Sequence, residues 1–213
     1  MPDDEDGETP LPAGQAETTI AVDATGMHVV IGYNDTRGFP VNPATTVTSL
    51  SGYLYSDDGG ATFTDGGQLP IVSNGTFNGQ LYPQIYGDPT VVYLGGANFV
   101  YASIFVEGFT GAPPNFTGAA QTICVHRSTD YGHTWAGPFE VPPATNPTGV
   151  VVSNSARDAA DKELMDADPE TGRVLLAWSS LTVGSVIPGG VEISTTLSDD
   201  VMTATPPTWS TRQ

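Results

Sequence analysis

The stretch SDDGGATF (residues 56–63) recurs later in the chain as STDYGHTW (residues 128–135). Both copies carry Ser, Asp, Gly and Thr at intervals of two residues and an aromatic ring directly after the Thr. The copies begin 72 residues apart. A pattern that occurs twice in one chain is either a site that is used twice or a structural part that the fold needs more than once.

The residue types of this pattern are those of a tight turn. An Asp carboxylate can accept hydrogen bonds from N–H groups at the tip of a hairpin, Gly can adopt a positive φ, and the ring can pack below the turn. A catalytic role for the Asp would need a proton-transfer partner beside each copy, and no partner residue is repeated. We therefore interpret the pattern as a structural hairpin. Its residues are Ser56, Asp58, Gly60, Thr62, Phe63, Ser128, Asp130, Gly132, Thr134 and Trp135.

A third, incomplete copy follows in SDDVMTATPPTW (residues 198–209). Ser198 and Asp200 match the first two positions, and Ser198 lies 70 residues after Ser128. Met202 replaces the Gly, and the aromatic ring arrives late, as Trp209. We interpret this segment as the same hairpin with a longer tip.

Each hairpin is preceded by two apolar runs that flank a Gly-containing turn. These strand pairs cover residues 18–35, 89–106 and 163–180. Such runs are typical of strands buried on both faces, and the content of 25 Gly and 18 Pro favours tight turns. The repeated unit is therefore four strands in about 70 residues. Four-stranded units arranged radially are the blades of a β-propeller.

The sequence thus predicts an all-β protein with about three blades of four antiparallel strands. The predicted parts are an acidic, flexible leader at residues 1–16 and blades at about residues 17–80, 81–150 and 151–213. Three blades do not close a ring, and an open arc would expose strand edges and apolar faces. We expect its ends to be covered by the missing remainder of a longer chain, by a second copy or by other subunits.

The two intact hairpins resemble the Asp-box of the bacterial neuraminidase repeat, Ser-x-Asp-x-Gly-x-Thr-aromatic. From about Thr18 to Trp209, the chain is similar to the sialidase-like β-propeller superfamily. The resemblance implies that the box lies on the hairpin between the third and fourth strands of a blade, away from the active site. It also implies that the three blades belong to a six-bladed ring.

The same resemblance implies a set of catalytic residues: three arginines that grip a substrate carboxylate, a Tyr with a Glu partner, and an acid/base Asp. Arg37 is the best arginine candidate because it follows an inner strand pair, and Asp35 lies beside it. Arg37 lacks the family's Phe/Tyr-Arg-Ile-Pro context. Arg127 precedes a hairpin Ser and Arg173 follows a turn Gly, so we expect both on the surface, whereas Arg157 lies in a loop. We therefore expect no complete catalytic set in this chain.

Acidic residues stand just before the first strand of each unit: Glu17, Asp88, Asp161 and Glu163. In a propeller, the first strand of a blade lines the central channel. These carboxylates either solvate strand ends or converge at the channel mouth, where they would bind a cation or sugar hydroxyls. Carboxylate oxygens suit Ca²⁺ better than a transition metal, so Ca²⁺ is the possible cofactor and Asp88 and Asp161 are its candidate ligands.

The charge of the chain limits its partners. The formal net charge is −18, with only six Lys and Arg, so phosphate backbones and anionic membranes would repel it. Nucleic acid is therefore not an expected partner. No apolar run is long enough to span a membrane, and residues 1–14 lack the features of a signal peptide, although a removed signal would leave no trace.

The favoured hypothesis is an extracytoplasmic or secreted propeller segment that recognises a glycan or forms a surface scaffold with a protein partner. One alternative is a glycoside hydrolase of exo-sialidase type whose remaining catalytic residues lie in blades outside this chain. A second alternative is a purely structural interaction module.

Overall fold

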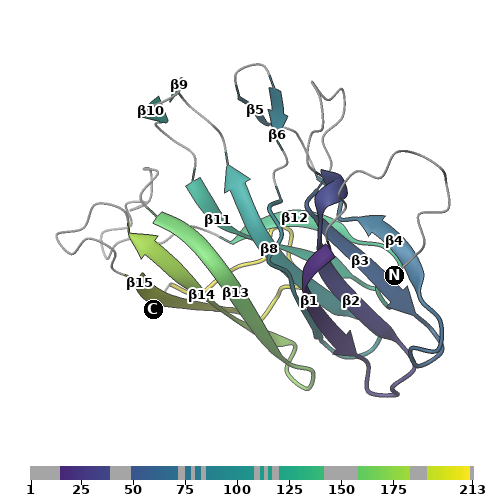
Figure 1. Ribbon diagram of the computed structural model, residues 1–213. Coiled ribbons are helices and arrows are strands. Elements are labelled where there is room, and N and C mark those ends of the chain that lie inside the picture. The colour runs from purple at the N-terminus through teal and green to yellow at the C-terminus, as the bar shows by residue number, and fades with distance from the viewer. Residues whose placement is uncertain are drawn as a thin grey trace, which may run out of the picture.

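The structure is a computed structural model that describes residues 15–38, 49–71, 75–77, 80–82, 85–107, 111–112, 115–116, 120–141, 158–182 and 191–211. Apart from the 3₁₀ turn η1 (Thr36–Gly38), these residues contain strands and connecting turns, and no helix that could cross a membrane lies among them. The strands form antiparallel sheets that stand side by side as blades (Figure 1). The predicted all-β, partial-propeller architecture is therefore confirmed. Of the predicted leader, residues 1–14 lie outside the described residues, and the predicted blade boundaries stay predictions.

Each blade pairs its strands in chain order. Blade 1 contains β1 (Gln15–Val22), β2 (Val29–Asp35), β3 (Ser51–Ser56) and β4 (Thr64–Gln68). Blade 2 contains β7 (Thr90–Tyr93), β8 (Phe99–Glu107), β11 (Ala120–Ser128) and β12 (Ala136–Val141). Blade 3 contains β13 (Asp158–Asp168), β14 (Arg173–Thr182) and β15 (Val191–Ser198).

Smaller elements complete the description. The Ser210 N–H donates to the Leu197 carbonyl (2.8 Å), on the side of β15 where a fourth strand of blade 3 would pair. One parallel bridge, Gln121 to Ala159, joins the sheets of blades 2 and 3. Two short hairpins lie at the upper edge of the blades in Figure 1: β5 (Gly75–Phe77) with β6 (Gln80–Tyr82), and β9 (Gly111–Ala112) with β10 (Asn115–Phe116).

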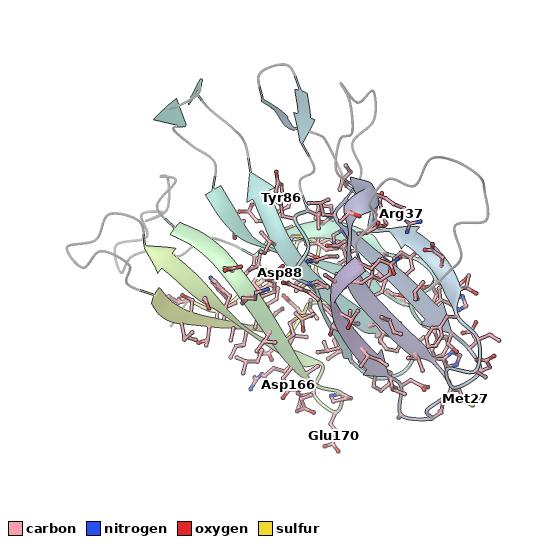
Figure 2. The ribbon with its side chains drawn as sticks, in the orientation of Figure 1. Met27, Arg37, Tyr86, Asp88, Asp166 and Glu170 are labelled. Atoms are coloured by element: carbon pink, nitrogen blue, oxygen red, sulfur yellow. The ribbon has the colours of Figure 1, made fainter. Side chains whose placement is uncertain are left out.

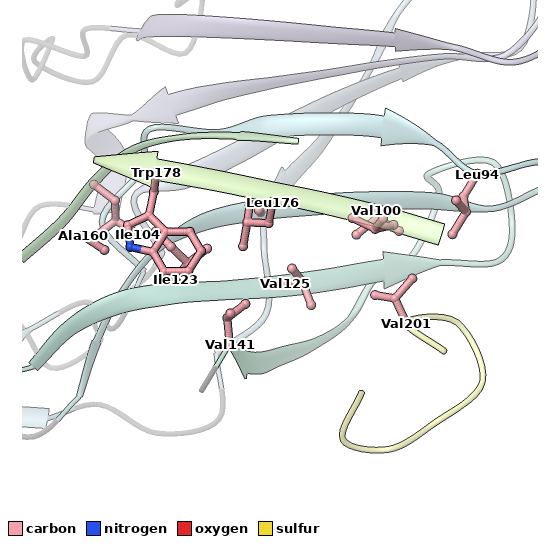
Figure 3. Packing of buried hydrophobic residues seen from close by; sticks show 12 residues of the cluster. Leu94, Val100, Ile104, Ile123, Val125, Val141, Ala160, Leu176, Trp178 and Val201 are labelled. Atoms are coloured by element: carbon pink, nitrogen blue, oxygen red, sulfur yellow. The ribbon is translucent and has the colours of Figure 1, made fainter. Parts of the chain in front are cut away.

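The hydrophobic core consists of two layers, one between each pair of neighbouring blades. Strand β8 supplies both layers in alternation, because successive side chains of a strand point to opposite faces. Phe99 and Tyr101 pack toward blade 1, whereas Val100 and Ala102 pack toward blade 3. Figure 3 shows Val100 in the layer toward blade 3. Burial on both faces explains why the inner strands read as nearly continuous apolar runs.

The repeated hairpins are closed by the same hydrogen bonds. Ser56 Oγ donates to Asp58 Oδ1 (2.8 Å), and Asp58 accepts from the backbone N (2.8 Å) and Oγ1 (2.6 Å) of Thr62. The second copy repeats these bonds between Ser128, Asp130 and Thr134, with distances of 2.7 Å, 2.9 Å and 2.6 Å. The Asp carboxylates are thus engaged in closing the turn.

The third hairpin reaches the same closure through a longer tip. Asp200 accepts a hydrogen bond from Ser198 Oγ (3.0 Å) and two from Thr208, at its backbone N (2.8 Å) and Oγ1 (2.6 Å). Thr208 therefore does in this copy what Thr62 does in the first. The late aromatic ring, Trp209, follows it directly, as Phe63 follows Thr62.

The two hairpin glycines give a matched test of inter-blade packing. Gly60 (φ 86°) and Gly132 (φ 87°) occupy equivalent positions, so an added methyl group strains both backbones alike. A Cβ on Gly132 would lie 2.4 Å from Val30 Cγ2 in blade 1, whereas a Cβ on Gly60 meets only the Phe63 ring at 3.6 Å. We expect Gly132→Ala to lower the free energy of unfolding by about 1–3 kcal/mol more than Gly60→Ala. Urea unfolding measures both losses, and equal losses would contradict the proposed packing.

The hairpin carboxylate also predicts a pH effect. Hydrogen bonds from Thr62 and Ser56 lower the pKa of Asp58 to about 2, below the value of about 3.9 expected in the unfolded chain. The stability from this group is present above about pH 4 and is lost as the pH falls through about 2. The difference in unfolding free energy between the wild type and Asp58→Asn should therefore shrink over this range. Acid titration of both proteins measures it, and a constant difference would contradict the assignment.

Candidate functional site

An unusual backbone feature recurs at or just before the inner strand of each of the three blades. Glu17, Asp88 and Lys162 each have a φ of 53°, although none of them is Gly. The pairing register shifts between Ala16 and Thr19 in β1 and between Asp161 and Leu164 in β13, which marks a β-bulge. A positive φ costs a non-Gly residue about 1–2 kcal/mol. Its occurrence at the same point of three blades indicates that the direction of these side chains matters.

The three side chains meet and form what we call the axial cluster, which consists of Glu17, Asp88 and Lys162. Lys162 Nζ lies 2.6 Å from Glu17 Oε1 and 3.0 Å from Asp88 Oδ2. Asn34 fixes Asp88, because its Oδ1 accepts from the Asp88 backbone N (2.6 Å) and its Nδ2 donates to Asp88 Oδ1 (3.4 Å). Figure 2 shows Asp88 between β13 and β1. The axial cluster therefore connects all three blades.

The charges of the axial cluster stabilise one another. The hydrogen bond to Glu17 raises the pKa of Lys162, and the contact with Asp88 raises it further, so Lys162 is a cation at neutral pH. Burial raises the pKa of Asp88, but its hydrogen bonds with Glu17, Lys162 and Asn34 together outweigh burial, and the net pKa is lowered. The lysine and Glu17 remain largely exposed, with 58% and 43% of their side chains accessible. Their polar groups are therefore available to a ligand.

Glu163, the residue after Lys162, lies in a different environment. Its side chain is buried, and neither carboxyl oxygen has a hydrogen-bond partner among the described residues. Burial raises the pKa of Glu163 well above its usual range, and the charges of Asp88 and Asp161 add to this effect. Burial therefore favours the neutral form of the Glu163 carboxyl group. Asp161 is half-buried and pairs through its backbone with Ser179 of β14.

The acidic residues before the inner strands were expected either to solvate strand ends or to converge at the channel mouth, where they would bind a cation or sugar hydroxyls. Glu17 and Asp88 do converge, and the ammonium group of Lys162 lies between them. Within the described part of the chain, no group of three His, Cys, Asp or Glu residues has an arrangement that could hold a metal ion. The calcium site at Asp88 and Asp161 stays a prediction.

The candidate catalytic pair, Asp35 and Arg37, forms an ion pair at the end of β2. Buried Asp35 accepts from Arg37 Nε at 3.0 Å and 2.9 Å, one distance for each carboxylate oxygen. Arg37 also contacts Asp65 (3.3 Å) and donates to Tyr33 Oη (3.3 Å). Burial raises the pKa of Tyr33 to about 12, so this phenol stays protonated at neutral pH. Sequence reasoning missed Tyr33 and Asp65 as members of this network.

The other described arginines contact the third hairpin, at the opposite ends of the strands from the axial cluster. Arg127 Nη1 donates to the carbonyls of Val201 (2.9 Å) and Ala204 (2.6 Å) in the third hairpin. Arg173 pairs with Asp199 (2.6 Å). Arg157 lies outside the described residues. Arg37 thus lies at the end of β2, next to Asn34 of the axial cluster's support, whereas Arg127 and Arg173 contact the third hairpin.

Removal of the central ammonium group tests the axial cluster. Lys162→Met leaves two adjacent carboxylates without a counter-charge, so we expect the free energy of unfolding to fall by about 1 kcal/mol at neutral pH. The loss should shrink as the pH falls below about 3.9, the value for Asp in an unfolded chain, toward the lowered pKa of Asp88. Thermal unfolding across this pH range measures both effects. Lys162→Arg is the control that keeps the charge, and an equal loss in both variants would contradict an electrostatic role.

Comparisons with known proteins agree with the fold. No family model and no curated protein matches the chain. The GH93 α-L-arabinofuranosidase of Fusarium graminearum, solved with arabinobiose, matches with a TM-score of 0.58 and 13% identity, over 93% of this chain and 47% of that chain. A protein of unknown function from Dyadobacter fermentans matches with a TM-score of 0.55 and 20% identity, over 93% and 54%. The chain thus spans about half the length of these structures, and the similarity shows the fold.

Proposed function

We propose that this chain is a segment of an extracytoplasmic, sialidase-like Asp-box propeller that binds a neutral glycan at the axial cluster. The convergence of Glu17, Asp88 and Lys162 from equivalent points of three blades carries this proposal. The hairpins with the Asp-box pattern lie at the other ends of the strands, which leaves the side of the axial cluster available for binding.

The chemistry of the axial cluster suits sugar hydroxyls. A hydroxyl group both donates and accepts hydrogen bonds, a carboxylate accepts them, and an ammonium group donates them. Adjacent hydroxyls on one sugar can therefore bind Glu17 and Lys162 together. The arabinobiose bound to the Fusarium enzyme supports a glycan as the ligand class.

The charge around the axial cluster favours a neutral sugar over an acidic one. A carboxylate-bearing sugar is best held by a planar guanidinium group. Arg37, the described arginine on this side, is already bound to Asp35 and Asp65. Asp161, next to the cluster, and the formal net charge of −18 add repulsion toward an anionic ligand.

The second candidate function is a sialidase-type hydrolase with further catalytic residues outside this chain. The contact of Tyr33 with Arg37 and Asp65 favours it, because a Tyr, an Arg and an acid then lie in one network. Turnover of a fluorogenic sialoside by the full-length protein tests this candidate. Absence of turnover in a folded sample would contradict it.

Calorimetric titration tests glycan binding at the axial cluster. The probes are arabinobiose and longer neutral oligosaccharides, with sialyllactose as the acidic probe. We expect the neutral probes to bind and sialyllactose to give no heat. Glu17→Gln and Asp88→Asn should weaken binding by about tenfold or more, which corresponds to about 1.4 kcal/mol.

The control variant is Asp199→Asn, which also removes an exposed carboxylate and its ion pair, but on the hairpin side. It should bind like the wild type. A preference for sialyllactose, or equal losses in Asp199→Asn and Glu17→Gln, would contradict the proposed site. No binding of any probe would favour the purely structural interaction module.

A further inference from the structure

Large exposed apolar side chains gather at the two open ends of the arc of blades. The front face, on blade 1, consists of Ile20, Val22 and Phe63, and the rear face, on blade 3, consists of Leu164, Leu175 and Ile193. All six are between 42% and 71% exposed. So many large apolar side chains at the blade ends mark an interaction surface.

The front face of blade 1 corresponds to the face of blade 2 that is buried against blade 1. By the repeat, Ile20 and Phe63 of blade 1 correspond to Val91 and Trp135 of blade 2. Val91 and Trp135 are buried against blade 1, where the Trp135 ring meets Tyr53 edge-on with centroids 5.8 Å apart. The front face of blade 1 therefore has the residue types of a blade junction.

The rear face of blade 3 corresponds to the face of blade 2 that is buried against blade 3. The register from each hairpin Ser makes Leu175 equivalent to Val100 and Ile193 equivalent to Ile123. Val100 and Ile123 are buried in the core layer between blades 2 and 3 (Figure 3). The rear face of blade 3 is therefore the other half of a blade junction.

Neighbouring inner strands are also joined by one repeated hydrogen bond. The backbone N of Val91 donates to Thr19 Oγ1 (3.3 Å), and that of Met165 donates to Thr90 Oγ1 (3.3 Å). Blade 3 has Leu164 at the position of these threonines. A junction on the rear face thus depends on apolar contact at this point.

We propose that a second copy of this chain covers both faces, with the rear face of each copy packed on the front face of the other. Two copies supply six blades, and each copy spans 47% to 54% of the two similar solved chains. Such a head-to-tail contact closes around a two-fold axis. It also places two axial clusters at one channel mouth.

The net charge of the chain determines how dimer formation should depend on salt. Each copy has a formal net charge of −18, so two copies repel each other at low ionic strength. Salt screens this repulsion and leaves the apolar contact. The dimer fraction should therefore rise with added salt.

Light scattering after size-exclusion chromatography tests the proposal. For the chain of 213 residues, the expected mass is twice 22.2 kDa. Ile20→Asp and Ile193→Asp change exposed residues on the front and rear faces, so each should fold, by circular dichroism, and run as a monomer. The control is Met27→Asp in the β1–β2 turn, which is also an exposed large apolar residue but lies outside both faces, and it should stay dimeric (Figure 2).

A mixing experiment tests the head-to-tail contact. A mixture of the Ile20→Asp and Ile193→Asp proteins has one intact junction, so dimers should return. A wild-type monomer at every concentration and salt would overturn the proposal and assign the faces to another partner. Dimers that survive both variants, or a series of larger assemblies, would also overturn it.

Discussion

Burial of each sheet on both faces is the constraint on which this structure depends. A strand such as β8 sends Tyr101 toward blade 1 and Val100 toward blade 3, so it is covered only when a blade lies on each side. The hairpins serve the same constraint, because their Asp residues close the turn and Trp135 fills the junction with blade 1. Blades 1 and 3 each have one face that no other blade of this chain covers, so burial of that face requires a partner.

The axial cluster is the polar counterpart of these apolar junctions. Three strained backbone positions direct one side chain per blade toward the same point, and the positive charge of Lys162 lets two carboxylates lie close together. Asn34 holds Asp88 from the second strand of blade 1, so the cluster is positioned by paired strands. The Glu17 and Lys162 side chains are exposed, which makes a structural junction also a candidate binding surface.

Much of the fold could be predicted because the hairpin chemistry is local. Ser56, Asp58 and Thr62 lie within seven residues, and their spacing reveals the turn without tertiary information. The repeat placed Glu17 and Asp88 at equivalent positions but left open whether they converge, and Lys162 was missed. A bulge changes which way a side chain points, and the sequence alone does not display the bulge. Asp65, 28 residues from Arg37, was missed because that contact depends on the pairing of β2, β3 and β4.

The central functional claim is that the axial cluster contacts a neutral glycan. The most direct measurement is the NMR chemical shift of the Lys162 side-chain ammonium group during titration with arabinobiose and then with sialyllactose. The account predicts a saturable shift at Lys162 with the neutral sugar and none with the acidic one. Shifts confined to the hairpin side, or a Lys162 signal that responds only to sialyllactose, would contradict it.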